Sequence, residues 1–341
     1  MRYDSGRKKL LIYTTYNPYD PGIPGFFVFM VRSINRALVV GSSNVDLVFS
    51  NIQLPQPGET LTGSGFKQFY GGKGANQAIA LQASGEAVCF VSALGRDAFG
   101  TQYLDHLKAL GIPVDGIFQS MDASTGIAGI FVGANGENSI SVAPGANRFL
   151  EAGHLEQVLG NENQAFRYAL LQMELRPDVV ELCISVLHSR QIPVVLNLAP
   201  FFPLTRSTLE KVEVLVLNQT EAQSLAGWEI TDRNSGERIC QYIQTSMGIP
   251  NVVLTLGGDG AIWCGKQMSF SPAFPVDVVD ATGAGDVFCA YFSRCFFSPD
   301  HKSDALRRAS AAAALSIQKM GAQSGIPSWE QVDQFLNGQP G

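Results

Sequence analysis

The chain has 341 residues, of which 45% are hydrophobic and 16% charged, so it is neither disordered nor fibrous and can form one large domain or two small ones. Its formal net charge of −6 comes without a run of basic residues, which argues against an electrostatic footprint for nucleic acid. No stretch of about 18 consecutive apolar residues occurs, so we expect no membrane span. The six cysteines are scattered without C-x-x-C spacing, which is typical of free thiols in a reducing cytoplasm, where we expect the protein to act.

Residues 1–36 differ from the rest of the chain, and we expect them to form a poorly ordered N-terminal extension. They contain two short apolar pieces separated by Pro21-Gly22, without the unbroken apolar region of a secretory signal. Met30 is a candidate for the biological start, because the regular pattern begins at Ala37. N-terminal mass spectrometry that finds Met1 on the native protein would refute this hypothesis.

From Ala37 onward, short apolar runs typical of buried strands alternate with amphipathic helical stretches. This alternation predicts an α/β fold with a mostly parallel sheet and helices on both faces. The predicted strands cover residues 37–41, 87–91, 169–173, 194–198, 214–217 and 252–256. The predicted helices cover residues 74–84, 99–110, 178–190, 205–211, 220–226, 235–247, 285–296 and 304–318.

Residues 46–70 and 117–142 interrupt the alternation with β-rich runs and turns. The second segment contains Asn135-Gly136 between two such runs, which is a strong hairpin signal. These insertions predict a small antiparallel β lid on the α/β core. Because the sites of open α/β sheets lie outside the carboxyl ends of the strands, a lid there would exclude water from the site.

The strongest chemical signal is the run Asp-Ala-Thr-Gly-Ala-Gly-Asp at residues 280–286, which is followed by an apolar helical stretch. Small residues before a helix let backbone N–H groups converge on an anion. Asp286 in the first turn can then accept the proton of an attacking hydroxyl group, as phosphoryl transfer requires. The alternative is a glycine-rich loop whose aspartate only caps the helix.

Four weaker signals accompany this run. The sequence Gly71–Ala78 offers close backbone approach, a lysine cation and an amide side chain. Asn44 and Asp46 follow the first strand on the same side of extended backbone, which suits the vicinal hydroxyls of a sugar. Glu221 lies in the first turn of a helix and would hold Mg²⁺ through water, and Thr255–Gly260 would border a nucleotide. Singly, each signal is also typical of an ordinary turn or helix cap.

Several common catalytic patterns are missing from the sequence. It has no G-x-x-x-x-G-K-[ST] run and no G-x-G-x-x-G after a strand, which argues against a P-loop kinase and a nicotinamide-dependent enzyme. It also lacks H-E-x-x-H, zinc-type Cys/His spacing and a nucleophile elbow. We therefore expect any acid–base chemistry to depend on carboxylates.

Taken together and in this order, the five motifs resemble the sugar-kinase family that holds ribokinase, fructokinase and adenosine kinase. The resemblance covers residues 37–335, which we take as the kinase domain. It implies a Rossmann-like α/β domain with a β lid, and a homodimer in which the lids of two subunits clasp. It also implies ATP as co-substrate, Mg²⁺, and K⁺ as an activating cation.

The resemblance also implies roles for individual residues. Asp286 would be the base, and the amides of Gly283, Ala284 and Gly285 would form an anion hole. The sugar would contact Asn44, Asp46, Gly72, Lys73, Gly74, Asn76, Glu174 and Asp286. ATP would contact Asn218, Thr255, Leu256, Gly257, Gly258, Asp259, Gly260, Gly285 and Ser310. Mg²⁺ would bind near Glu221, and K⁺ beside Asp280, Thr282, Ser316, Lys319, Gly321 and Gly325.

Three positions depart from the family pattern: Ala281 replaces a usual Thr, Ser310 a His of some members, and Gly325 a frequent Ser. The run Gly-Gly-Lys-Gly-Ala-Asn-Gln-Ala and residues 138–147 look like ribokinase, which implies phosphorylation of the 5-hydroxyl of D-ribose by ATP to ribose 5-phosphate. The alternatives are a kinase for deoxyribose, fructose or adenosine, or a catalytically silent binding protein on this fold. A silent protein would have no need of the base at position 286.

Overall fold

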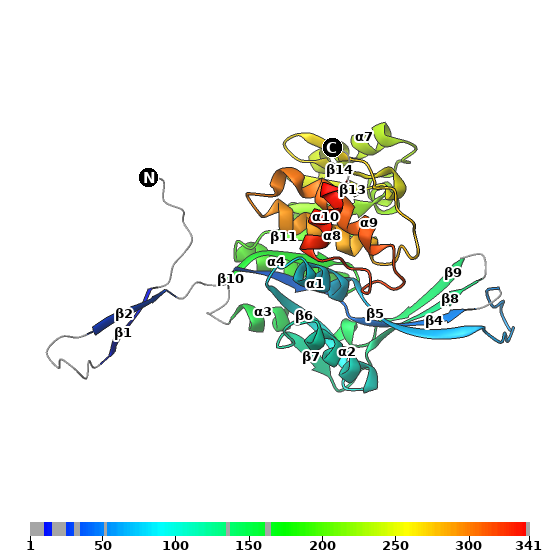
Figure 1. Ribbon diagram of the computed structural model, residues 1–341, viewed down its shortest axis with the longest axis horizontal. Coiled ribbons are helices and arrows are strands. Elements are labelled where there is room, and N and C mark those ends of the chain that lie inside the picture. The colour runs from blue at the N-terminus through cyan, green and yellow to red at the C-terminus, as the bar shows by residue number, and fades with distance from the viewer. Residues whose placement is uncertain are drawn as a thin grey trace.

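The computed structural model describes residues 10–15, 25–30, 35–50, 53–133, 137–160 and 165–338 (Figure 1). Its central sheet contains β3 (Asn35–Val40), β6 (Val88–Gly95), β7 (Ile117–Ser120), β10 (Ala165–Gln172), β11 (Val194–Asn197), β12 (Val214–Asn218), β13 (Asn251–Thr255), β14 (Ala261–Cys264) and β15 (Met268–Ser271). The strand order is β15-β14-β13-β12-β11-β10-β3-β6-β7, and all pairs are parallel except the last two along the chain, β13–β14 and β14–β15. The predicted mostly parallel sheet is confirmed.

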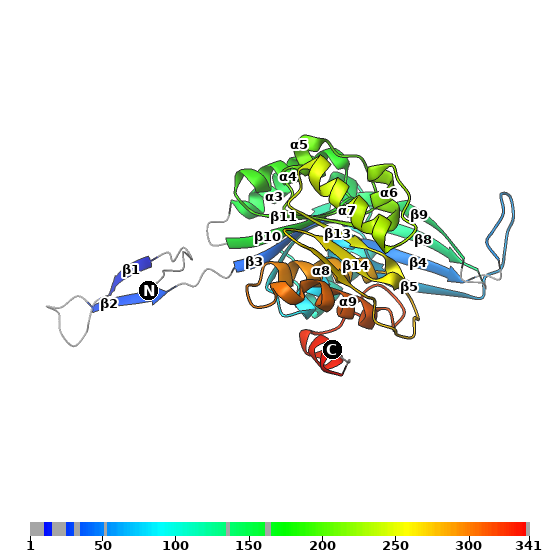
Figure 2. The ribbon, with the colours of Figure 1, turned by 90° about the horizontal axis from the view of Figure 1, so that it is seen from above.

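Helices cover both faces of this sheet (Figure 2). One face carries α1 (Lys73–Ala83), α2 (Ala98–Ala109), α8 (Ala284–Phe296), α9 (Ala305–Ser316) and α10 (Trp329–Asn337). The other carries α3 (Ala152–Leu159), α4 (Pro177–Ser189), α5 (Arg206–Leu209), α6 (Gln219–Ala226) and α7 (Arg233–Met247). The described residues also contain three short 3₁₀ helices: η1 (Gly145–Phe149), η2 (Gly257–Asp259) and η3 (Lys302–Asp304). None of the helices within the described ranges is long and apolar enough to cross a bilayer.

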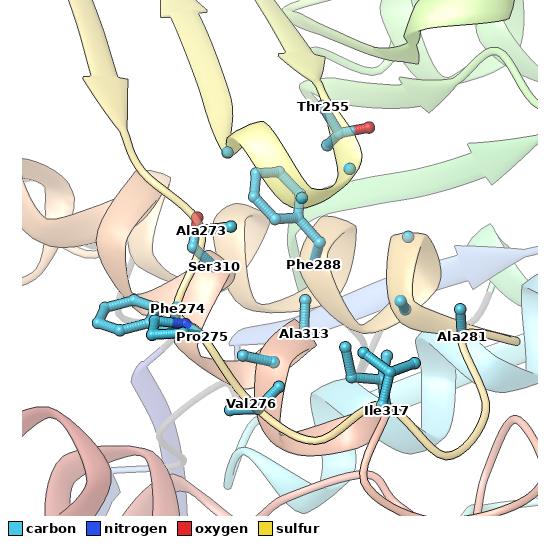
Figure 3. A pocket seen from close by; sticks show the side chains of 17 residues that line it. Thr255, Ala273, Phe274, Pro275, Val276, Ala281, Phe288, Ser310, Ala313 and Ile317 are labelled. Carbon is cyan, nitrogen blue, oxygen red and sulfur yellow. The ribbon is translucent and has the colours of Figure 1, made fainter.

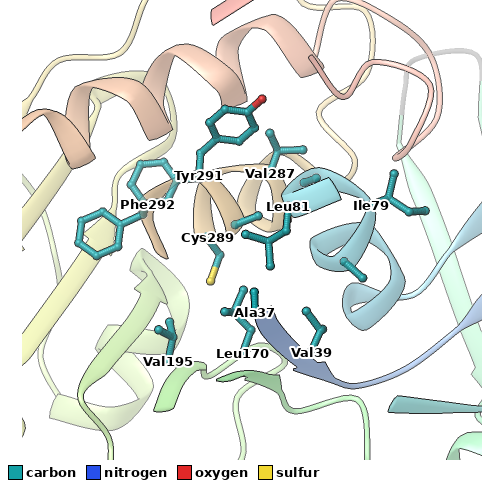
Figure 4. Packing of buried hydrophobic residues seen from close by; sticks show 14 of the residues in the cluster. Ala37, Val39, Ile79, Leu81, Leu170, Val195, Val287, Cys289, Tyr291 and Phe292 are labelled. Carbon is teal, nitrogen blue, oxygen red and sulfur yellow. The ribbon is translucent and has the colours of Figure 1, made fainter. Parts of the chain in front are cut away.

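The central strand β3 shows why the strands are continuous apolar runs. Ala37 and Val39 pack in the cluster under α1 and α8, whereas Leu38 and Val40 pack in the cluster on the opposite face. Figure 4 shows Leu81 of α1 on the same side as Ala37 and Val39, within the first cluster. Because successive side chains of a strand point to opposite faces, burial on both faces requires every position to be apolar.

The order of connections places a topological switch point between β3 and β10, and we refer to the region at their carboxyl ends as the crevice. From β3 the chain moves to β6 and β7 on one side, and after the lid it returns to β10 and continues to β13 on the other side. The loops that follow β3 and β10 therefore leave in opposite directions, which is the usual place for a ligand in an open α/β sheet. The Ser42 hydroxyl after β3 donates to Glu174 Oε2 after β10 at 2.5 Å, across this crevice.

A separate four-stranded sheet projects from the body in Figure 1. It consists of β4 (Asn44–Ser50), β5 (Gly65–Gly71), β8 (Gly126–Val132) and β9 (Asn138–Ala143), in the order β5-β4-β8-β9. Its two hairpins, β4–β5 and β8–β9, are antiparallel, and β4 and β8 join them in parallel. The expectation that the second lid segment begins at residue 117 is wrong, because Ile117–Ser120 form β7 and pair with β6. The predicted turn at residues 134–136 lies outside the described residues.

Two strands lie within the predicted N-terminal extension. β1 (Leu10–Thr15) and β2 (Gly25–Met30) pair with each other in antiparallel fashion. β3 begins at Asn35, so the last two residues of the extension belong to the central sheet. The remaining residues of the extension lie outside the described residues, and both its poor order and a start at Met30 stay predictions.

Close packing of α1 on the end of β3 yields a stability prediction at Gly74. Alanine normally stabilises a helix interior relative to glycine by about 1 kcal/mol. At Gly74, however, a Cβ would lie 2.5 Å from the carbonyl carbon of Gly41. We expect Gly74→Ala to lower the free energy of unfolding by about 1–3 kcal/mol. Gly153→Ala in α3, where no atom lies within 4 Å of the added Cβ, is the matched control and should be neutral or stabilising. Equal effects of the two substitutions on urea unfolding would contradict the packing argument.

Candidate active site

A cavity of about 510 Å³ lies at the carboxyl end of β13, between the β13–β14 turn, residues 273–278 and helices α8 and α9 (Figure 3). Its volume is within the usual range for small-molecule sites. Six of the residues predicted to contact ATP line it: Thr255, Gly257, Gly258, Gly260, Gly285 and Ser310. The structure therefore brings together, in one cavity, residues that lie far apart in the sequence.

Three other predicted ATP contacts lie elsewhere. The Leu256 side chain is 4% exposed and packs in the hydrophobic core, away from the cavity. Asp259 is exposed on η2 and is not among the lining residues. Asn218 lines a smaller adjoining cavity. The direction of each side chain in a tight turn decides these outcomes, and the motif alone does not specify that direction.

The sequence prediction missed much of the apolar wall of the larger cavity. Phe274, Pro275 and Val276 form one side, and Phe288 and Ile317 come from α8 and the end of α9 (Figure 3). Such walls suit the flat faces of a planar base. No local signal marks these residues, because apolar side chains are common throughout this sequence.

The start of α8 presents backbone N–H groups to the site. Gly283 has a φ of 80°, which favours glycine, and its position would bring a Cβ within 2.9 Å of the Ala322 carbonyl oxygen. The N–H of Ala284 donates to the Ala281 carbonyl at 3.3 Å. Within the described part of the chain, the N–H groups of Gly283 and Gly285 have no protein acceptor. Two of the three predicted anion-hole amides are thus available to a ligand.

Asp286 lies in the first turn of α8 and is only 3% exposed. Its Oδ2 accepts a hydrogen bond from Asn76 Nδ2 at 2.9 Å, and its Oδ1 accepts one from Gln77 Nε2 at 3.1 Å. Both donors belong to α1, and Gln77 was not predicted although it follows Asn76 directly. The carboxylate is therefore fixed in orientation by two amides, and each oxygen keeps a lone pair for a substrate hydroxyl group.

A smaller cavity of about 220 Å³ lies in front of Asp286. It shares Thr255, Ala281 and Gly285 with the larger cavity, so the two adjoin at the start of α8. Lys73 also lines it, and the charge of Asp286 raises the pKa of the lysine in spite of its burial. The site thus holds a permanent cation beside the free amides and the carboxylate.

Glu221 and Asn218 border the same cavity and form a capping box at the start of α6. Glu221 Oε2 accepts from the Asn218 N–H at 2.8 Å, and Glu221 Oε1 from Asn218 Nδ2 at 2.9 Å. Burial raises the pKa of Glu221 above its usual value. The helix-cap interpretation therefore holds, and the same carboxylate also faces the cavity where a metal–phosphate complex would lie.

The residues predicted to bind sugar gather around the crevice between β3 and β10. Asn44 is buried, and its Oδ1 accepts from Asn147 Nδ2 at 2.8 Å. Glu174 Oε2 accepts from the Lys73 N–H at 3.0 Å, which ties the crevice to the start of α1. Gly72 has a φ of 92°, and a Cβ there would lie 2.7 Å from the Asn44 backbone nitrogen, so only glycine fits this turn.

Asp46 is the most perturbed carboxyl group of the crevice. It lies on β4 opposite β5, and a Cβ added at Gly71 would fall 2.2 Å from its Oδ2. Burial, together with the negative charge of Glu174, raises the pKa of Asp46 to about 7. Two acidic groups thus share a confined space in the absence of ligand.

The residues predicted to surround K⁺ lie on two adjoining loops. Asp280 Oδ1 accepts from the Thr282 N–H at 2.9 Å, and Asp280 Oδ2 from the Gly321 N–H at 2.8 Å. Although burial opposes the shift, these hydrogen bonds hold the pKa of Asp280 below its usual value. Gly325 packs so closely on Ser316 that a Cβ would lie 2.0 Å from the Ser316 carbonyl oxygen.

Two further observations bear on the predicted metal ions. Lys319 is exposed, so only its backbone carbonyl belongs among the predicted oxygen ligands. No group of three or more His, Cys, Asp or Glu side chains that could hold a metal ion occurs in the described residues.

A buried carboxylate, two free helix-start amides and an adjoining cavity of nucleotide size define a phosphotransferase that acts on a hydroxyl group. This class agrees with comparisons with known proteins. The chain belongs to the pfkB family of carbohydrate kinases, whose family model matches residues 35–329.

The most informative relatives are sugar kinases of nearly equal length. The chain is 35% identical over 303 residues to the ribokinase of Haemophilus influenzae, covering 87% of this chain and 97% of that protein. It is 33% identical over 301 residues to the deoxyribokinase of Salmonella typhimurium, covering 88% and 98%. Its structure is similar to that of Arabidopsis thaliana ribokinase complexed with ribose and ATP, with a TM-score of 0.81 and 29% identity over 89% of this chain and 99% of that chain.

The raised pKa of Asp46 yields a prediction for the stability of the ligand-free protein. Between pH 3.8 and about 7 the carboxyl group is ionised in the unfolded chain but protonated in the folded one, so the native state loses stability as the pH rises. Asp46→Asn removes this dependence. The free energy of unfolding of the Asp46→Asn variant, minus that of the native protein, should therefore increase by roughly 2–3 kcal/mol between pH 5 and pH 8, because one pKa unit corresponds to about 1.4 kcal/mol. Thermal unfolding of both proteins at the two pH values measures this, and a difference that does not vary with pH would contradict it.

Proposed function

We propose that the protein transfers the γ-phosphoryl group of ATP to the 5-hydroxyl group of D-ribose, giving ribose 5-phosphate and ADP. The observation that supports this most directly is the position of Asp286, which lines the smaller cavity next to the nucleotide-sized one. It binds Asn76 of α1, the helix whose first N–H group, that of Lys73, binds Glu174. Similarity to several ribokinases supports ribose as the sugar.

In this proposal each part of the site has a separate role. The adenine lies between the apolar walls of the larger cavity, and the phosphates extend past Gly285. Asp286 accepts the proton of the sugar hydroxyl as the new O–P bond forms and the bond to the ADP oxygen breaks. The Gly283 and Gly285 amides and the Lys73 ammonium group stabilise the charge on the transferred group.

We assign the sugar to the crevice lined by Asn44, Asp46 and Glu174. Carboxylates and amides of this kind can each bind one or two hydroxyl groups, and the neighbouring glycines allow the backbone to approach the ring. Asn76 then contributes in a different way from the prediction, because its amide nitrogen binds Asp286. The crevice and the base are thus parts of one site.

Both predicted metal ions remain part of the proposal. Mg²⁺ prefers oxygen ligands and retains water, so the carboxylate of Glu221 at the smaller cavity fits an ion held through water. When bound, Mg²⁺ would neutralise charge on the phosphates. K⁺ fits the loops at 280–282 and 316–325, which offer backbone carbonyls beside the Asp280 carboxylate.

We also propose a homodimer through the lid. Ile140 and Val142 are each 54% exposed on one face of the four-stranded lid sheet, and Phe66 is 56% exposed on the other face, where it packs on Phe49. Exposed apolar side chains on a projecting sheet support an interface between subunits. Sedimentation velocity would show a single monomer peak if the proposal is wrong.

The cytoplasmic location stays a prediction.

Deoxyribose is the second candidate substrate, because the deoxyribokinases are nearly as similar to the chain as the ribokinases. A silent binding protein is disfavoured, because two amides hold a buried carboxylate where a pure binder has no use for a base. ATP consumption measured with ribose, deoxyribose, fructose and adenosine separates these alternatives. Ribose should give the highest kcat/KM, and preference for any other acceptor would overturn the substrate assignment.

Replacement of the base tests the mechanism. Asp286→Asn keeps the size of the side chain but cannot accept the hydroxyl proton, so we expect kcat to fall about 100- to 10,000-fold. Ribose binding, measured by calorimetry, should change little. Asp105→Asn, at an exposed aspartate of α2 with 69% of its side chain accessible, is the control and should leave turnover unchanged. Near-normal turnover of the Asp286 variant would exclude a role as base.

The cation site yields a separate prediction. Replacing Na⁺ with K⁺ in the buffer at constant ionic strength should raise kcat, because a bound K⁺ would order the 279–282 loop that leads into the anion-hole amides. Asp280→Asn should reduce this response, since it removes an acceptor for the Thr282 and Gly321 N–H groups. Steady-state rates across a K⁺ titration measure the effect. A flat response in the native protein would remove K⁺ from the proposal.

A further inference from the structure

A chain of hydrogen-bonded side chains leads from the base toward the surface. Asn76 Nδ2 donates to Asp286 Oδ2 at 2.9 Å, and Gln323 Nε2 donates to Asn76 Oδ1 at 2.9 Å. Gln323 Oε1 lies 2.8 Å from Nε2 of His106, which is half-buried on α2. The four residues lie on α8, on α1, in the loop that follows α9, and on α2. Their hydrogen bonds therefore connect four separate segments to Asp286.

The ionised base dictates the direction of every hydrogen bond in this chain. An ionised carboxylate can only accept, so Asn76 must turn its NH₂ group toward Asp286 and its oxygen toward Gln323. Gln323 must then turn its own NH₂ group toward Asn76 and its oxygen toward His106. His106 must therefore donate from Nε2, which assigns the Nε2–H tautomer to its neutral ring. Reversal at any one link would place two acceptors or two donors against each other.

Gln323 is also connected to the sugar side of the site. Its Nε2 lies 3.2 Å from the hydroxyl of Tyr103, which is fully buried and donates to the Gly71 carbonyl at 2.6 Å. Gly71 ends the lid strand β5 and precedes the turn that enters α1. The ring of Tyr70, from the same strand, stacks on His106 with centroids 4.0 Å apart and an angle of 16°. Both ends of the Gln323 amide therefore contact side chains, Tyr103 and His106, that pack against the end of lid strand β5.

The second donor to the base has different neighbours. Gln77 donates to Asp286 Oδ1, and its own Oε1 accepts from Gln172 Nε2 at 2.7 Å. Gln172 is the last residue of β10 and is 1% exposed. This arm ends in the central sheet, whereas the arm through Asn76 and Gln323 ends at the lid and at the loop predicted to bind K⁺.

We propose that Gln323 is a positioning residue for Asp286. It fixes the orientation of the Asn76 amide, and through His106 and Tyr103 it makes that orientation depend on the placement of the lid strand. The proposal rests on the proposed role of Asp286 as the base. Gln323 itself touches neither the substrate nor the base, so its effect should appear in turnover rather than in sugar binding.

Two substitutions at this position separate hydrogen-bond direction from packing. Gln323→Met keeps the approximate volume but offers no amide, so the Asn76 oxygen loses its donor. Gln323→Glu keeps the shape but places an acceptor against the Asn76 oxygen, which favours rotation of that amide and turns its oxygen toward Asp286. We expect kcat to fall about 10-fold in the Met variant and about 100-fold in the Glu variant, with KM for ribose within about twofold of the native value.

Gln334→Glu is the matched control for the added charge. Gln334 is exposed on α10 and lies outside the loops that we assign to the site. It should retain the native kcat. Native-like turnover in both Gln323 variants, or equal losses in Gln323→Glu and Gln334→Glu, would overturn the proposal.

A spectroscopic measurement tests the hydrogen-bond direction without using activity. Imidazole ¹⁵N spectra at alkaline pH should show His106 as the Nε2–H tautomer, with the signal assigned by its loss in His106→Asn. Gln323→Met should convert this signal to a mixture of tautomers, because the acceptor of the Nε2 proton is gone. An Nδ1–H tautomer in the native protein would overturn the proposed direction. If the protein failed to phosphorylate any sugar, the proposed function would fall while the tautomer result would stand on its own.

Discussion

The buried carboxylate of Asp286 is the constraint on which the rest of the site depends. A charge at 3% exposure is costly unless donors are already in place, and here Asn76 and Gln77 provide them from a single helix. This requires α1 and α8 to lie side by side, as the first hydrophobic cluster allows. It also requires α1 to start close to β3, which is possible because Gly41 and Gly74 face each other without side chains.

The same constraint explains why the sugar and nucleotide halves meet where they do. Strand order makes the loops after β3 and β10 diverge, so the Ser42–Glu174 hydrogen bond spans a crevice created by topology alone. α1 begins beside Glu174, and its buried residues pack in the first hydrophobic cluster. Asn76 and Gln77 near its start donate to the Asp286 carboxylate, while the Lys73 N–H binds Glu174. In the proposed function, the start of this one helix would therefore set the distance between the two substrates.

The sequence predicted what local patterns determine. Strands buried on both faces must be apolar throughout, and glycines that begin a helix must remain small, so the parallel sheet and the Asp286 run were both recognisable. It did not predict features that depend on contacts between distant segments. Ile117–Ser120 have strand character, but only pairing with β6 places them in the central sheet rather than the lid. Leu256 was expected to contact ATP but packs in the core, whereas Phe274, for which the sequence predicted no role, lines the cavity. Gln77 and Gln323 are ordinary amides until the fold brings Gln77 to Asp286 and Gln323 to Asn76, which also binds Asp286.

The crevice also shows a conflict between stability and function that local rules would not produce. Burial and the negative charge of Glu174 both disfavour ionisation of Asp46, and nothing in the hydrophobic core requires a carboxylate there. A fold optimised for stability would replace one of them with an amide. Sugar hydroxyl groups, however, donate hydrogen bonds, and a polyol in the crevice would supply donors to both carboxylates at once. Hydrogen bonds from such a ligand would offset the cost of placing the two acidic groups together, which would favour a hydroxyl-rich ligand. This reasoning connects the most perturbed carboxyl group of the crevice to the class of substrate, independently of the similarity to known kinases.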